Sequence, residues 1–168
     1  MKQIFLFLVF LPLLGCSSLL KNKATSKDFN CPSVFFSSED RVYIDNAISL
    51  DEVTIKAEFN NFAINNKCQY LKDVAVIPLN ILIVAKPMSN SEKPNLSLPI
   101  YVSLLDTNND VIETQYFSLS FSMNRDALTK KLIETDIKDR IQIVTKNNET
   151  TQLVIGFMLD NRKRDLLD

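Results

Sequence analysis

An alternation of apolar and polar residues with a period of two runs through much of the chain. Residues 53–59, "VTIKAEF", carry apolar side chains at every second position, the pattern of a half-buried β-strand. After Asn60 and Asn61 the apolar phase changes to Phe62 and Ile64, which predicts a β-bulge or bend. A shorter alternation over residues 41–45 predicts another strand.

Residues 74–87, "VAVIPLNILIVAKP", are apolar nearly throughout. This pattern is typical of a central strand that is covered on both faces, or of a strand that crosses a sandwich. Pro78 lies inside the run and cannot donate a hydrogen bond to a neighbouring strand. We therefore expect an edge or a bulge at Pro78.

Two hairpins are predicted in the second half of the chain. Segments 100–106 and 111–123 alternate on either side of a polar turn, with Phe117 and Leu119 on one face and serines on the other. Segments 140–145 and 151–159 flank a second polar turn in the same way.

Residues 126–140, "DALTKKLIETDIKDR", depart from this pattern. Leu128, Leu132 and Ile133 have helical spacing after Asn124, a residue type that caps helices. A short helix and an irregular strand fit this segment equally well.

Together these elements predict an all-β chain. About seven strands with frequent turn signals are typical of an antiparallel β-sandwich of immunoglobulin-like type. Residues 98–121 also resemble the strand-turn-strand of extracytoplasmic FxLyD-type domains. A length of 168 residues suits one such domain.

The N-terminus has the pattern of an export signal. Lys2 precedes an apolar run over residues 4–14, which is too short to span a bilayer but suits a signal peptide. The run ends in "LLGC", residues 13–16, which resembles the bacterial lipobox. The resemblance implies that the thiol of Cys16 receives a lipid and that cleavage occurs between Gly15 and Cys16. An ordinary signal peptide followed by a chance cysteine is the alternative.

The predicted organisation follows from this anchor. Residues 1–15 form the signal peptide, 16–30 the lipidated cysteine and a flexible tether, 31–162 the β-sandwich and 163–168 a charged C-terminal tail. Ser17 occupies the position at which aspartate tends to retain lipoproteins at the inner membrane. We therefore expect a lipid-anchored protein of the cell envelope that faces the periplasm, with the outer membrane favoured.

Two cysteines remain after Cys16 is assigned to lipid. Cys31 and Cys68 form an even pair in an oxidising compartment, so we predict a disulfide between them. Two free thiols are the alternative. The chain has no CxxC motif, which argues against a thiol oxidoreductase.

Composition excludes several kinds of chemistry. The formal net charge is −1 and no basic stripe is present, so nucleic acid is not an expected partner. The chain contains no histidine, which excludes triads with a histidine base. Its two glycines, Gly15 and Gly156, cannot form a Gly-rich phosphate loop. No cofactor and no metal site is predicted.

No polar cluster in the sequence has the pattern of a catalytic or metal site. Residues 106–110, "DTNND", resemble a calcium loop, but Val111 and Phe117 stand where an EF-hand needs glycine and glutamate, so a hairpin turn is the better interpretation. The acidic residues near position 136 alternate with lysine and arginine, as on a solvated face. The tyrosines suit either a recognition surface or half-buried strand positions. These residues are Glu134, Asp136 and Asp139 for the acidic cluster, and Tyr43, Tyr70, Tyr101 and Tyr116 for the tyrosines.

The mature chain resembles a family of small proteobacterial lipoproteins of unknown function. The resemblance rests on Cys31-Pro32 after the tether, on Cys68, and on "VIGFMLD" before "NR" at the C-terminus, with Gly156 and Phe157 in the last strand. It supports the lipoprotein interpretation and implies no activity.

These observations favour a non-enzymatic envelope lipoprotein that serves as an accessory or protein-interaction subunit. The alternative is a binder or carrier of an apolar envelope ligand, with a pocket lined by Phe117, Phe121 and Ile83. A hydrolase that works with carboxylates alone is a third hypothesis, which would need two acids converging in a cleft.

Overall fold

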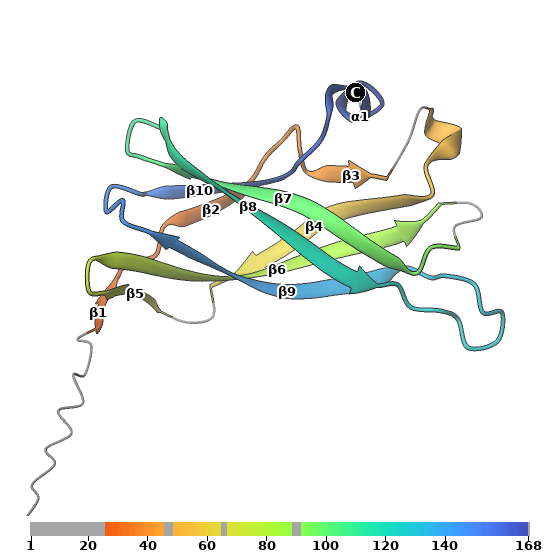
Figure 1. The fold of residues 1–168 in the computed structure, drawn as a ribbon, viewed down its shortest axis with the longest axis horizontal. Coiled ribbons are helices and arrows are strands. Elements are labelled where there is room, and N and C mark those ends of the chain that lie inside the picture. Colours follow the sequence, from red (N-terminus) through yellow and green to blue (C-terminus); the bar gives the residue numbers. More distant parts are fainter. Residues whose placement is uncertain (1–25, 46–48, 65–66, 89–91, 168) are drawn as a thin grey trace, which may run out of the picture.

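The structure, a computed structural model, describes residues 26–45, 49–64, 67–88 and 92–167. Two β-sheets lie face to face as a sandwich, which confirms the all-β prediction (Figure 1). The six-stranded sheet contains β1 (Ser26–Phe29), β3 (Val42–Ile44), β4 (Ile55–Ala63), β5 (Cys68–Leu71), β6 (Val74–Pro87) and β9 (Thr135–Thr145). The four-stranded sheet contains β2 (Ser33–Phe36), β7 (Asn95–Leu105), β8 (Val111–Ser122) and β10 (Gln152–Phe157). A 3-10 helix, η1 (Leu50–Glu52), and a short helix, α1 (Asn161–Asp165), complete the described elements. The immunoglobulin-like type of the sandwich stays a prediction.

Strand β6 is the centre of the six-stranded sheet. One of its edges pairs with β9 over residues 75–85, and the other pairs first with β5 and then with β4. Between Val76 and Asn80 this second edge has no partner among the described strands. Pro78 lies in that interval, where a missing N–H leaves the pairing intact. The register of β4 shifts between Phe59 and Asn61, which confirms the predicted bulge.

The first predicted hairpin is confirmed as β7 and β8. Their antiparallel register runs from Asn95 opposite Ser122 to Leu105 opposite Val111. In the turn, a side-chain oxygen of Asp106 accepts hydrogen bonds from the backbone N–H groups of Asn108 (2.8 Å) and Asp110 (3.0 Å). Asn109 has φ of 67°, so asparagine takes the left-handed position that often holds glycine. The calcium-like motif is therefore a hairpin turn.

The second predicted hairpin is wrong. β9 pairs with β6 in one sheet, whereas β10 pairs with β7 and, in parallel, with β2 in the other sheet. The connection after Thr145 thus crosses from one layer to the other. A period-two pattern identifies which face of a strand is buried but not which strand lies beside it, and this explains the error.

Of the ambiguous segment, residues 126–134 form a loop without a helix, and residues 135–140 belong to strand β9. A bridge between Arg125 and Leu132 closes a loop, and β9 begins only at Thr135. Inside the loop the Asp126 carboxylate accepts hydrogen bonds from the N–H groups of Leu128 and Thr129, and these bonds lower the pKa of Asp126, with Thr129 the larger cause. An aspartate that bonds to nearby backbone in this way competes with helix formation. Leu128 is 91% exposed, so its spacing did not mark a helical face.

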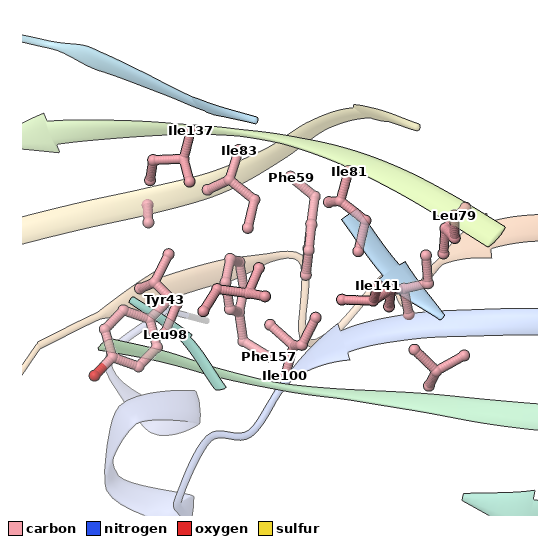
Figure 2. Packing of buried hydrophobic residues seen from close by; sticks show 14 of the residues in the cluster. Tyr43, Phe59, Leu79, Ile81, Ile83, Leu98, Ile100, Ile137, Ile141 and Phe157 are labelled. Atoms are coloured by element: carbon pink, nitrogen blue, oxygen red, sulfur yellow. The ribbon is translucent and has the colours of Figure 1, made fainter. Parts of the chain in front are cut away.

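The space between the sheets is filled by side chains (Figure 2). Phe59 of β4 stacks on Phe157 of β10 at 4.1 Å between ring centroids, which joins the two layers. Ile83 is fully buried, and Phe117 and Phe121 pack against the same cluster. These three residues therefore contribute to a packed core, whereas the carrier hypothesis requires them to line a pocket.

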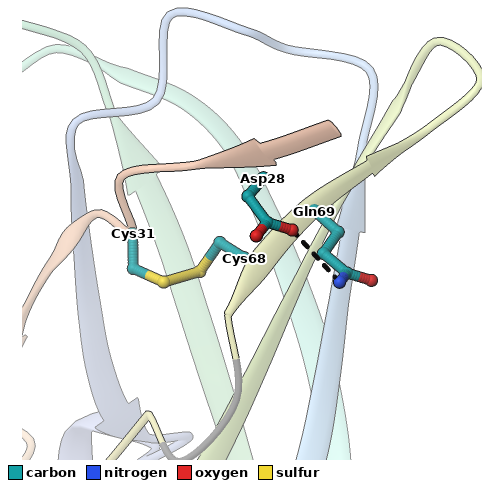
Figure 3. The surroundings of a disulfide bond; sticks show 4 residues. All are labelled: Asp28, Cys31, Cys68 and Gln69. Atoms are coloured by element: carbon teal, nitrogen blue, oxygen red, sulfur yellow. Dashed lines mark hydrogen bonds between the residues drawn. A yellow bond between two sulfur atoms is a disulfide. The ribbon is translucent and has the colours of Figure 1, made fainter. Parts of the chain in front are cut away.

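The predicted disulfide is present. Cys31 and Cys68 are joined, with 5.3 Å between their Cα atoms, and Cys68 is fully buried (Figure 3). Beside the bond, Asp28 accepts a hydrogen bond from the Gln69 amide at 3.3 Å and one from Lys67 Nζ at 2.6 Å. The Lys67 hydrogen bond lowers the pKa of Asp28.

Both ends of the described chain pack against the sandwich. Ser26–Phe29, expected inside the tether, form β1, because this segment pairs with β5 and the ring of Phe29 lies 4.5 Å from that of Tyr70. At the other end, inside the predicted C-terminal tail, Leu166 and Leu167 after α1 pack against Ile44 and Val53. The predicted signal peptide (1–15), Gly15 and Cys16 lie outside the described residues.

Candidate functional site

The outer face of β6 is largely apolar, and no element in the described part of the chain covers it. Inward-facing residues of this strand, such as Ile77 and Ile83, are fully buried. Outward-facing Val76, Leu82 and Val84 are only half-buried, and no described element packs over them. A strand with apolar side chains on both faces is expected to be covered on both faces. The structure thus leaves one row of this strand without the cover that its sequence predicts.

This row is the floor of a long groove. Three hollows follow one another along β6, with volumes of ≈ 230, ≈ 380 and ≈ 540 Å³. Neighbouring strands form the walls, with β9 on one side and β4 and β5 on the other. We call this surface the β6 groove and define it by its floor and walls. Its floor is Val76, Pro78, Asn80, Leu82 and Val84, and its charged walls are Arg41, Lys56, Glu58, Lys67, Lys86, Glu134, Lys138, Asp139 and Arg140.

The groove walls are positively charged on balance. Six basic and three acidic residues line them, in a chain whose formal net charge is −1. Two of the cations pair with wall acids, Arg41 with Glu58 at 3.6 Å and Lys86 with Glu134 at 3.2 Å. A third cation, Lys67, pairs with Asp28 at 2.6 Å. Lys56 and Lys138 stand on opposite sides of β6 and make no ion pair within the described part of the chain. The groove therefore combines an apolar floor with positive walls.

A second polar cluster lies beside the four-stranded sheet, and its residues Asp40, Tyr101 and Arg164 are joined by hydrogen bonds. Asp40 is 4% exposed and accepts hydrogen bonds from the Tyr101 hydroxyl at 2.8 Å and from Nε of Arg164 at 2.9 Å. Burial raises the pKa of Tyr101, and the hydrogen bond to Asp40 raises that of Arg164. The ammonium of Lys163 lies 4.5 Å from the ring centroid of Tyr43. This cluster fastens α1 to the sandwich, so we assign it a structural role.

The three acidic residues considered as catalytic candidates have different surroundings. Glu134 pairs with Lys86, Asp136 points to solvent, and Asp139 accepts a hydrogen bond from the N–H of Arg140. No group of three or more histidine, cysteine or acidic residues in the described segments could hold a metal ion. Among these segments, no helix has both the length and the apolar character needed to cross a membrane.

The tyrosines and serines mostly occupy ordinary strand positions. Tyr43 is buried and Tyr101 is held by Asp40, whereas Tyr116 is 66% exposed on the outer face of the four-stranded sheet. Ser118 shares this face and lies 2.6 Å from Ser97, oxygen to oxygen. The serines of β8 thus form the polar face of a strand, as predicted.

Sequence reasoning did not identify the β6 groove. The information was present in residues 74–87, where apolar side chains occupy both strand faces. The pattern predicts a strand that is covered on both faces or one that crosses a sandwich, and the structure shows that no described element covers one of these faces.

Comparisons with protein-family models, with curated proteins and with solved structures give no match for this chain.

Proposed function

We propose that the protein is a lipid-anchored, non-enzymatic subunit of the bacterial cell envelope, which faces the periplasm and binds a protein partner through the β6 groove. The observation that carries this proposal is the uncovered apolar row of β6, because exposed apolar surface rimmed by polar residues is typical of interaction sites. The outer membrane is the favoured location.

The anchor at Cys16 is supported by the lipobox and by the disulfide. A Cys31–Cys68 bond suits an oxidising compartment, the one that an exported lipoprotein reaches. Residues 17–25 separate Cys16 from β1, and the ten steps from Cys16 to Ser26 can span at most ~35 Å, so the anchor would keep the sandwich close to the bilayer.

The packed interior favours binding at the surface over carriage of an apolar ligand. Ile83, Phe117 and Phe121 contribute to one continuous core, and opening a pocket among them would leave a cavity where the sheets now pack together. A surface groove needs no such rearrangement.

The anchor is tested by growing cells with a clickable palmitate analogue. We expect label on the full-length protein and its recovery with membranes, with both lost in Cys16→Ser. The variants Cys31→Ser and Cys68→Ser should remain labelled. A labelled Cys16→Ser variant, or an unlabelled wild-type chain, would contradict the lipid anchor.

Interaction is tested by crosslinking cells and purifying the full-length protein in mild detergent. We expect one envelope protein in a fixed ratio, lost in Leu82→Glu on the groove floor and retained in Ser120→Glu on the opposite sheet. Recovery of the same proteins from both variants would exclude the groove as the binding surface.

A further inference from the structure

We propose that the occupant of the β6 groove is an extended, acidic polypeptide segment of the partner, with alternate apolar side chains directed at the floor. This inference rests on the proposed function and specifies its partner. Two features of the groove carry it: the spacing of the floor residues and the charge of the walls.

The floor has the geometry of an extended chain. Its apolar residues Val76, Pro78, Leu82 and Val84 take alternate positions along one strand, with polar Asn80 in the middle of the row, so successive floor positions are ~7 Å apart. From Val76 to Val84 the floor measures about 25–30 Å at ~3.3 Å per residue. A segment of about eight to ten extended residues matches this length, and every second side chain would meet the floor.

The walls select the charge of that segment. Val84 lies between Glu58 of β4 and Asp136 of β9. Lys138 of β9 lies beside Leu82, and Lys56 of β4 lies beside Lys86, two residues beyond Val84, so one unpaired ammonium group stands on each side of β6. Carboxylates on the solvent-facing positions of a bound segment would meet these cations, and such complementarity sets partner choice and association rate.

The same charges argue against two other occupants. A second copy of this chain would bring an identical excess of positive charge, and a symmetric contact through the groove would oppose like charges. An anionic lipid would satisfy one or two cations with its headgroup, but it would not match an apolar row repeated at strand spacing over the length of β6.

The test is selection from a library of random displayed peptides of about ten residues, the length that spans the floor. The full-length protein in mild detergent is the bait. We expect enriched peptides that are net acidic and carry alternating apolar residues, with affinities that fall as salt is raised. The double variant Lys56→Glu, Lys138→Glu should bind these peptides at least ~10-fold more weakly and should select neutral or basic ones instead. Lys93→Glu, in the loop between β6 and β7, is the matched control and should behave as wild type. A new preference for basic peptides cannot arise from misfolding.

Three results would overturn the inference. The first is enrichment without acidic bias, or a bias that persists in the double variant. The second is a concentration-dependent dimer that Leu82→Glu dissociates, which would identify a second copy as the occupant. The third is binding to vesicles containing anionic phospholipid that the double variant loses, without any selected peptide. The crosslinking test with Leu82→Glu reports separately on the proposed function. That variant should lose any partner held in the groove, whatever the charge of the partner.

Discussion

The ring of Tyr101 lies against the backbone of Gly156, so close that a β-carbon on Gly156 would come within 2.5 Å of the ring. The two residues are neighbours across β7 and β10. This contact lets the Tyr101 hydroxyl reach Asp40, which in turn holds Arg164 of α1. The next residue, Phe157, fills the core. In the last strand, Gly156 thus leaves room for the ring of Tyr101, and Phe157 contributes its own ring to the core.

Replacing this glycine should destabilise the sandwich. In Gly156→Ala the added methyl group must displace the Tyr101 ring, and overpacking of this kind costs about 1–3 kcal/mol. Urea unfolding followed by circular dichroism would measure the loss. Ser120→Ala, exposed on the same sheet, is the control and should change the free energy of unfolding by less than about 0.5 kcal/mol. An unchanged midpoint for Gly156→Ala would show that Tyr101 moves aside at no cost.

The docking of α1 should depend on one arginine. Arg164 is the helix residue that bonds to buried Asp40, whereas Arg162 on the same helix is exposed. Hydrogen exchange of the amides of Lys163, Arg164, Leu166 and Leu167, which are hydrogen-bonded within this segment, should accelerate in Arg164→Gln and stay as in wild type in Arg162→Gln. Equal exchange in both variants would mean that Leu166 and Leu167 suffice to hold the helix.

Stability should fall at alkaline pH through Tyr101. Burial raises the pKa of Tyr101 above its ordinary value of 10.0. Below pH 10.0 both the folded and the unfolded chain hold the phenolic proton, and the contribution of Tyr101 to the free energy of unfolding is fully present. Above it the unfolded chain releases that proton first, so the free energy of unfolding decreases as pH rises through the folded pKa.

The comparison that isolates this effect is wild type against Tyr101→Phe from pH 8 to pH 11 (about the range over which phenols titrate). The wild type should be more stable at the lower end, and its advantage should shrink toward the upper end. An advantage that stays constant across the range would rule out a raised pKa at Tyr101.

The disulfide should contribute a large part of the stability. Cys31 and Cys68 are 37 residues apart, and closing a loop of this length contributes roughly 4 kcal/mol in the chain-entropy model. Unfolding of the double variant Cys31→Ser, Cys68→Ser should occur at lower urea concentration than that of wild type. Reductant should destabilise the wild type alone. If reductant leaves its midpoint unchanged, the bond is absent from the purified protein.

Local patterns predicted the local features of this fold. Period-two alternation identified β4 and β8, the phase change at Asn60 identified a bulge, and Asp106 marked a turn through its own side chain. The cysteine pair could be predicted because the lipobox interpretation assigns Cys16 to lipid and leaves two other cysteines.

Features that depend on distant residues could not be predicted. Asp40 and Arg164 are 124 positions apart. The local sequence "NRKRDLLD" does not indicate that one of its arginines pairs with a buried carboxylate. The sheet assignment of β10 depends on β2 and β7, which its own alternation does not specify. The β6 groove escaped prediction for a related reason, because an apolar row looks the same in sequence whether it is covered by the chain itself or by a partner.

The most direct test of the account is a photo-crosslinking amino acid placed at Leu82 in the groove and, separately, at Tyr116 on the opposite sheet, each in full-length protein in living cells. We predict that irradiation joins the Leu82 position to a single envelope protein, within a segment rich in aspartate and glutamate, and that the Tyr116 position gives no such product. The same crosslinks from both positions, or none from Leu82, would contradict the claim that this protein acts by holding a partner in the β6 groove.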